Sequence, residues 1–139
     1  MARTRRKKPI PPAVLVAEDE PTVRALAESI IGELGYATFS AANAREALAL
    51  LENGAPITLL LTDINMPDPP DGIDGLELAR LAVERRPDLR VIYTTGGELT
   101  DGMIALFVEG GTFLQKPYTR EKLIEAVNGE GEAEKPGSQ

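Results

Sequence analysis

The 139-residue sequence contains no cysteine, no histidine and no tryptophan. Without cysteine there are no disulfides, thiolate metal sites or thiol nucleophiles. Without histidine there is no phosphohistidine, and the side chain most often used as a general base or zinc ligand is missing. Any chemistry must therefore depend on carboxylates, hydroxyl groups, lysine and the backbone. A run of about 18 apolar residues, the minimum for a transmembrane helix, is also missing, so we expect no membrane span and a cytoplasmic location.

Charge is unevenly distributed along the chain, whose formal net charge is -7. Residues 1–12 contain five basic residues and no acidic one, and end in prolines, which predicts a basic, disordered tail. A solvated arm is the simpler interpretation of this tail, and binding of lipid headgroups or nucleic acid is the alternative. The rest of the chain is acidic, which disfavours duplex DNA as a partner, and we expect no DNA-binding domain. Residues 129–139 are polar and predict a second disordered tail.

Five short apolar runs alternate with five segments of helical periodicity between these tails. The expected strands are 13–17, 36–40, 56–63, 90–95 and 112–115, and the expected helices are 21–35, 42–54, 75–87, 99–111 and 118–129. In the first helix we expect Val23, Leu26, Ile30 and Leu34 to face the core. Five successive β–α units predict an α/β fold with a doubly wound, five-stranded parallel sheet, formed as one domain over residues 13–128.

Polar residues stand where four of the predicted strands end. Glu18 and Asp19 follow the first strand, Asp63 ends the third, Thr95 ends the fourth and Lys116 follows the fifth. Ligands of open parallel sheets bind beyond the carboxyl ends of the strands, so we expect these side chains to converge. Taken singly, such residues are often helix caps or solvated surface charges. Their combination, one set at each of four strand ends, favours a site.

Converging carboxylates repel one another and need a compensating positive charge. Because cysteine and histidine are absent, Mg²⁺, or else Mn²⁺, fits such a site better than zinc does. Lys116 adds a second positive charge, and Thr95 adds a hydrogen-bond donor. A pocket of this kind accommodates a phosphoryl group, which Asp63 can attack to form an acyl phosphate.

Four segments of the chain resemble the receiver domain of bacterial two-component response regulators. They are VLVAEDEPTVR at 14–24, LLLTDINMP at 59–67, VIYTTGG at 91–97 and FLQKPYT at 113–119. The resemblance covers residues 13 to about 128 and implies a flavodoxin-like, CheY-like (βα)5 fold with the strand order 2-1-3-4-5. It also implies that Asp63 is the phosphoacceptor, and that Mg²⁺ is held by Asp19, by Asp63, by Glu18 through water and by the backbone carbonyl of Asn65.

The resemblance further implies how the domain responds to phosphorylation. Thr95 and Lys116 would contact the phosphoryl oxygens, and the Lys116–Pro117 bond is expected to be cis. Phe113 stands at the family's switch-aromatic position and would rotate as Thr95 moves, although an ordinary core aromatic is the alternative. Gly97 provides no side chain beside the acyl phosphate, which predicts moderate to fast self-hydrolysis.

The segment MPDPPDGIDG is about four residues longer than its counterpart in the family, and the extra length lies in a Pro-rich insertion at residues 68–74. Either a shaped partner surface or a tolerated loop insertion accounts for it.

The expected function is that of a stand-alone receiver, not of an enzyme with a separate substrate. A histidine kinase or a histidine phosphotransfer protein would phosphorylate Asp63, and the face formed by the fourth helix, fifth strand and fifth helix would meet a protein partner, with a phosphorylation-dependent homodimer as a further option. Three alternatives stay open: a phosphate sink without effector, a Mg²⁺-dependent phosphohydrolase with Asp63 as nucleophile, and a flavodoxin-like cofactor module. Haloacid-dehalogenase-type hydrolases carry a second aspartate where this chain has Asn65, and the acidic EDEP after the first strand is unlike a flavodoxin phosphate loop.

Overall fold

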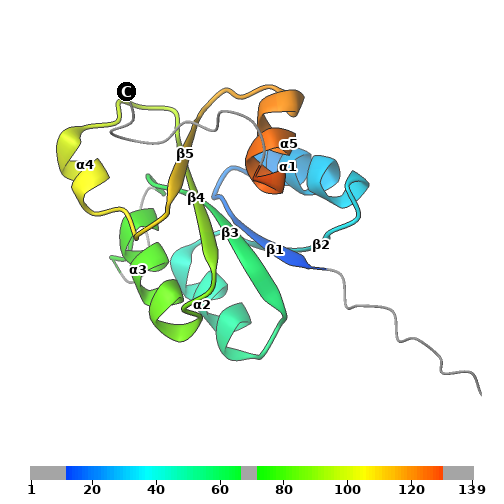
Figure 1. Cartoon of the computed structure of the whole chain (residues 1–139), viewed down its shortest axis with the longest axis horizontal. Coiled ribbons are helices and arrows are strands. Elements are labelled where there is room, and N and C mark those ends of the chain that lie inside the picture. Colours follow the sequence, from blue (N-terminus) through cyan, green and yellow to red (C-terminus); the bar gives the residue numbers. More distant parts are fainter. Residues whose placement is uncertain (1–11, 67–71, 130–139) are drawn as a thin grey trace, which may run out of the picture.

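The computed structural model describes residues 12–66 and 72–129, which form a five-stranded parallel sheet with helices on both faces (Figure 1). The strands are β1 (Ala13–Ala17), β2 (Ala37–Ala41), β3 (Ile57–Asp63), β4 (Arg90–Thr95) and β5 (Thr112–Gln115). The helices are α1 (Pro21–Glu33), α2 (Ala44–Glu52), α3 (Gly75–Arg85), α4 (Asp101–Ala105) and α5 (Arg120–Asn128). The sheet order is β2-β1-β3-β4-β5, which confirms the predicted fold. The predicted tails and most of the Pro-rich insertion lie outside the described residues.

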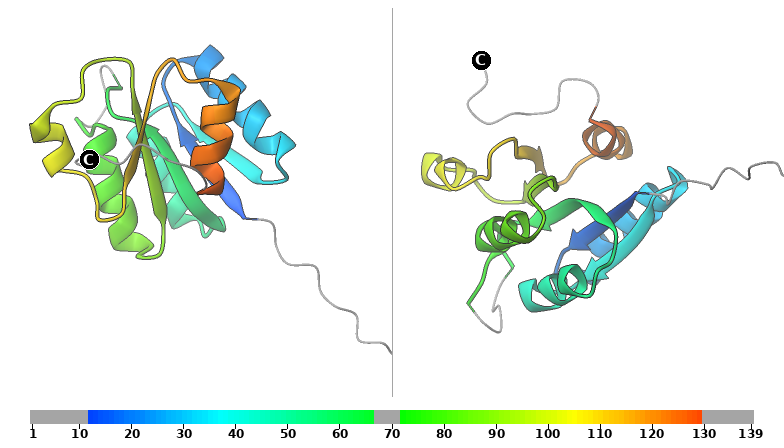
Figure 2. Two further views of the ribbon diagram at one scale, coloured as in Figure 1. Left: turned by 45° about the horizontal axis from the view of Figure 1, so that its top comes forward. Right: turned by 60° about the horizontal axis from the view of Figure 1, so that its bottom comes forward.

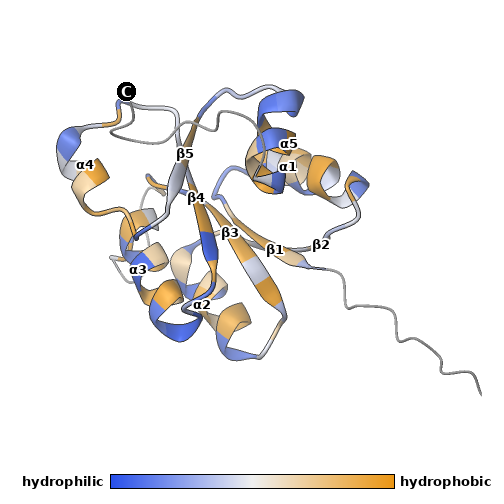
Figure 3. Cartoon of the chain, viewed as in Figure 1, coloured by the Kyte–Doolittle hydropathy of each residue, from blue (hydrophilic) through white to orange (hydrophobic). Residues whose placement is uncertain are grey.

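The sheet is buried on both faces because each face carries its own pair of helices. Helices α1 and α5 pack on one face, and α2 and α3 pack on the other (Figure 2). All five residues of β1 are buried, and β3 is buried except at Thr58. Figure 3 shows mostly apolar colour along β1 and β3, two of the inner strands of the sheet. Their near-continuous apolar sequences are typical of parallel strands covered on both sides.

The buried face of α1 differs from the one expected. Ala27, Ile30 and Ile31 are buried, whereas Leu26 is 58% exposed. The stripe that faces the sheet runs through positions 23, 27, 30, 31 and 34, which are three or four residues apart, and Leu26 lies beside this stripe. The expectation that Leu26 faces the core was therefore wrong.

Helix α4 is much shorter than the predicted helix over residues 99–111. It covers only Asp101–Ala105 and contains no buried residue. Gly102 weakens the helix, and the following Leu106 is 63% exposed, so no continuous apolar stripe anchors further turns. The chain then passes through Gly110, whose φ is 80°, before β5 begins.

The described part of the chain contains no candidate for a membrane-spanning helix. None of the helices within residues 12–66 and 72–129 has both the length and the apolar composition needed to cross a bilayer.

Candidate functional site

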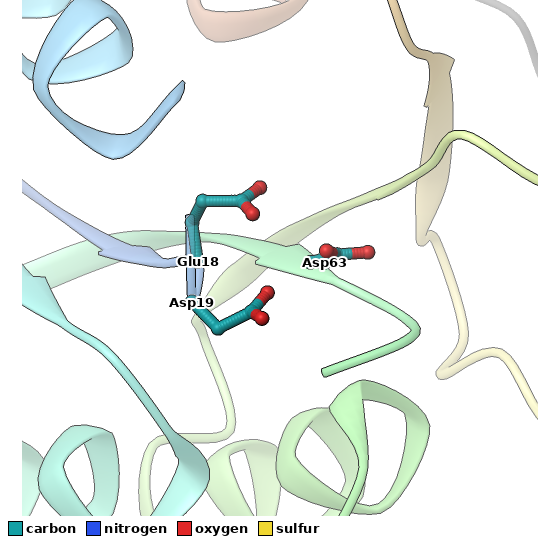
Figure 4. Close-up of side chains that lie close together, drawn as sticks. All are labelled: Glu18, Asp19 and Asp63. Atoms are coloured by element: carbon teal, nitrogen blue, oxygen red, sulfur yellow. The ribbon is translucent and has the colours of Figure 1, made fainter. Parts of the chain in front are cut away.

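Three carboxylates gather at the carboxyl edge of the sheet. Glu18 and Asp19 directly follow β1, and Asp63 is the last residue of β3, the neighbouring strand. One carboxylate oxygen from each of the three lies within 4.8 Å of the others, and the side chains point toward a common space (Figure 4). Glu18 and Asp63 are only 4% and 5% exposed, whereas Asp19 is half-buried. The structure therefore brings together the three acidic residues that the strand ends indicated.

Lys116 lies between two of these carboxylates. Its Nζ donates to Glu18 Oε1 at 3.0 Å and to Asp63 Oδ2 at 3.1 Å. Burial disfavours the charged ammonium group, but the hydrogen bonds to Glu18 and Asp63 outweigh this effect and raise the pKa of Lys116. At neutral pH Lys116 is therefore positively charged.

A single lysine does not compensate all three acidic groups. Burial raises the pKa values of both Glu18 and Asp63, although the hydrogen bond from Lys116 opposes the rise in each case. The carboxylates are thus held in a place where their negative charge is costly. A hard cation with oxygen ligands relieves this cost, so the donor set fits Mg²⁺ or Mn²⁺.

The backbone around Asp63 is closely tied to its neighbours. Asp63 Oδ1 accepts a hydrogen bond from the Asn65 backbone N–H at 3.1 Å, and the Gly75 backbone N–H donates to the Ile64 carbonyl at 3.0 Å. A side chain at position 75 would overlap the carbonyl group of Asp63, so only glycine allows α3 to begin this close to the end of β3. Helix α3 therefore fixes the strand end that carries the carboxylate.

Thr95 is fully buried at the end of β4, and its hydroxyl group has two donors. The Asn65 side-chain Nδ2 donates to Thr95 Oγ1 at 3.0 Å, and the Gly97 backbone N–H donates to the same oxygen at 3.1 Å. The sequence predicted a role only for the backbone carbonyl of Asn65, which stays a prediction. The side chain of Asn65 was missed, although its position two residues after Asp63 was visible.

Gln115 is a second contact that the sequence reasoning missed. It pairs in register with Thr95, and its Nε2 donates to the Thr95 carbonyl at 2.9 Å and to the Gly97 carbonyl at 3.4 Å. The available signal was its place opposite Thr95 and directly before Lys116. Gln115 holds the chain that leaves β4 against β5.

Glu18 is oriented by α1. The Arg24 Nη1 donates to the Glu18 carbonyl at 2.7 Å, and the Glu20 backbone N–H donates to Glu18 Oε2 at 3.2 Å. The side chain of Glu20 is exposed and caps nothing, although the residue occupies the N-cap position of α1.

The predicted cis bond and the predicted switch residue both lie on or next to β5. The Lys116–Pro117 peptide bond is cis, as predicted. Phe113 is buried in the core cluster on the α2 and α3 face and pairs in register with Tyr93 of β4. Its role as a switch stays a prediction, as does the effect of Gly97 on self-hydrolysis.

Comparisons with known proteins agree on one family. The family described as the response regulator receiver domain matches residues 14–128. The chain is 34% identical over 118 residues to the transcriptional regulatory protein AruR of Pseudomonas aeruginosa, a match covering 81% of this chain and 46% of AruR. It is 39% identical over 83 residues to the response regulator receiver protein CpdR of Brucella abortus, covering 60% of this chain and 65% of CpdR. The chain thus spans less than two thirds of the length of either relative.

Solved structures of receiver proteins superpose on this chain. A response regulator receiver protein from Sinorhizobium medicae superposes with a TM-score of 0.77 at 28% identity, covering 86% of this chain and 93% of that one. The receiver domain of the hybrid histidine kinase CckA superposes with a TM-score of 0.69 at 34% identity, covering 84% of this chain and 96% of that one.

Proposed function

Because the chain belongs to the response regulator receiver domain family, we propose that Asp63 accepts a phosphoryl group from the phosphohistidine of a histidine kinase or histidine phosphotransfer protein. An oxygen of the Asp63 carboxylate attacks phosphorus, the P–N bond of the donor breaks, and the imidazole leaves. The product is an acyl phosphate on this chain. The protein is then a phosphoacceptor, not an enzyme that turns over a separate substrate, and it acts in the cytoplasm.

The contact between Lys116 Nζ and Asp63 Oδ2 at 3.1 Å is the observation that carries this proposal. The charged ammonium group of Lys116 is only half-buried. It can pair with the Asp63 carboxylate before the reaction and with the incoming phosphoryl oxygens during it. Asp19, Asp63, the backbone carbonyl of Asn65 and, through water, Glu18 would hold Mg²⁺. The ion, when bound, offsets the charge of the phosphoryl group.

Thr95 is proposed to carry the response away from the site. Asn65 and Gly97 both donate to its hydroxyl oxygen, and Thr95 would donate its hydroxyl proton to a phosphoryl oxygen. A movement of Thr95 would shift the chain between β4 and α4 and change the packing of Phe113. The surface formed by α4, β5 and α5 would then meet a protein partner or a second copy of the chain.

The test compares Asp63→Asn with a matched control, Asp88→Asn, which changes an exposed aspartate away from the site. Both proteins are incubated with radiolabelled acetyl phosphate and with a panel of labelled histidine kinases, in Mg²⁺ and in EDTA. We expect labelling of the wild type and of Asp88→Asn only in Mg²⁺, and none of Asp63→Asn. Labelling that survives in Asp63→Asn would contradict the proposal.

Two further measurements, of partner binding by the labelled protein and of phosphate release from monoesters, separate the proposal from two of the alternatives. A phosphate sink would become labelled but would acquire no partner. A phosphohydrolase would release phosphate from monoesters over many turnovers, and no observation favours it, because Asn65 occupies the position of the required second acid and donates to Thr95.

A further inference from the structure

Tyr93 is fully buried in the middle of β4, although its side chain ends in a hydroxyl group. Its oxygen accepts a hydrogen bond from the Val108 backbone N–H at 2.9 Å. A buried hydroxyl group is costly without such a partner, so the bond fixes Val108 to the strand. The ring also stacks on Phe107, with 3.9 Å between the ring centroids and 25° between the planes. One side chain of β4 thus holds two successive residues of the segment that follows α4.

Gly111 shows how closely this segment passes the tyrosine ring. A Cβ atom at position 111 would lie 2.8 Å from Cε2 of Tyr93 and 3.1 Å from the carbonyl oxygen of Val108. The Gly111 backbone N–H also donates to that carbonyl at 3.0 Å. The turn over residues 108–111 is therefore shaped to fit against Tyr93, and a methyl group would separate the two.

The position of Tyr93 in the sheet connects this attachment to the candidate site. Tyr93 precedes Thr95 by two residues, so both side chains lie on the same face of β4. It also pairs in register with Phe113, the predicted switch residue. A displacement of Thr95 along β4 therefore reaches Tyr93 directly, without passing through α4, which has no buried residue of its own.

We propose that Tyr93 is a positioning residue: it anchors residues 106–111 to β4 and thereby makes this segment follow changes at the phosphoacceptor pocket. The anchoring rests on the observed contacts alone, whereas the transmission rests on the proposed function. The two parts are therefore tested by separate measurements on the same variants.

The first variant is Tyr93→Phe, which removes only the hydroxyl group. Its control is Tyr36→Phe, which removes another tyrosine hydroxyl group, one that donates to Asn128 Oδ1 at 2.9 Å on the exposed surface. Hydrogen exchange of the Val108 amide should become roughly tenfold faster in Tyr93→Phe, because one hydrogen bond is lost, and stay unchanged in Tyr36→Phe. An unchanged exchange rate in Tyr93→Phe overturns the anchoring.

Amide NMR spectra with Mg²⁺ and beryllofluoride measure the transmission. In the wild type we expect shifts at Thr95 and at residues 106–111. In Tyr93→Phe the shift at Thr95 should persist, whereas those at residues 106–111 should fall to about half or less, a change that a merely structural role would not produce. Equal shifts at residues 106–111 in both proteins overturn the transmission.

Gly111→Ala provides a second approach that keeps the tyrosine hydroxyl group. The added methyl group should push the turn away from the ring. Hydrogen exchange of the Val108 amide should then become faster, and the beryllofluoride-induced shifts at residues 106–111 should become smaller, as in Tyr93→Phe. Both changes together in Gly111→Ala support the proposal. Faster exchange of the Val108 amide with wild-type shifts at residues 106–111 overturns it. A wild type that shows no change at Asp63 or Thr95 would instead overturn the proposed function, and with it the transmission, while the exchange rates still decide the anchoring.

Discussion

Helices α3 and α4 each follow a strand that ends in the candidate site, but they are attached to the sheet in different ways. Helix α3 has 11 residues, of which Gly75, Leu76, Leu78, Ala79 and Ala82 are buried. Helix α4 has five residues and none is buried. It is held by the cap at Thr100 and, through the segment after it, by Tyr93. Regions with little buried apolar surface rearrange at low free-energy cost, so the α3 side keeps Asp63 in place while the α4 side can change.

Two leucines should show the largest difference in stability between the α3 and α4 regions. Leu78 of α3 is fully buried, whereas Leu106, just after α4, is 63% exposed. We expect Leu78→Ala to lower the free energy of unfolding by about 3 kcal/mol, because it removes buried methyl groups and leaves a cavity. Leu106→Ala should change it by less than about 0.5 kcal/mol. Urea unfolding measures both, and similar losses in the two variants would contradict the difference between the helices.

The next prediction concerns the carboxylate that α3 holds in place. Burial raises the pKa of Asp63 in the folded state. As the pH rises, the unfolded chain therefore loses this proton first, at about pH 4, and the free energy of unfolding falls until the folded-state pKa is passed. In EDTA at pH 7, Asp63→Asn should be more stable than the wild type, because the amide carries no negative charge for burial to penalise.

This gain should disappear below about pH 4, where the wild-type carboxyl group is protonated in both states. Thermal unfolding between pH 3.5 and 8 measures the difference, with Asp88→Asn as the control that should follow the wild type. An Asp63→Asn protein that is less stable than the wild type at pH 7 in EDTA would show that Lys116 more than compensates the burial of the carboxylate.

The same contrast explains what could be predicted from the sequence. Asp63 and Lys116 were found because the end of a parallel strand has a known place in the sheet, and a strand end is visible as the end of an apolar run. Helix α3 was found because its apolar periodicity is strong. The length of α4, the exposed Leu26 and the side chains of Asn65, Gln115 and Tyr93 were not found. The contacts of Asn65, Gln115 and Tyr93 join distant segments of the chain, which no local pattern contains. Leu26 lies beside the stripe of α1 that faces the sheet, and α4 is short because Gly102 weakens it and no continuous apolar stripe follows.

The smallest predicted effect compares two equivalent helix caps. Asp74 accepts a hydrogen bond from the Glu77 N–H at 2.9 Å at the start of α3, and Thr100 accepts one from the Met103 N–H at 3.2 Å at the start of α4. Loss of such a cap typically costs about 1 kcal/mol. In Asp74→Ala this cost should appear in the global free energy of unfolding, because α3 unfolds only with the core.

In Thr100→Ala the same loss should change the global free energy of unfolding by less than about 0.5 kcal/mol, because α4 opens without exposing buried residues. The effect should instead appear as faster hydrogen exchange of the amides of Met103 and Ile104, with the exchange of core amides in β3 unchanged. A global loss as large as that of Asp74→Ala would mean that α4 unfolds together with the core. The α4 side would then be as firmly attached as the α3 side, and a change at Thr95 would have to spread through the whole domain.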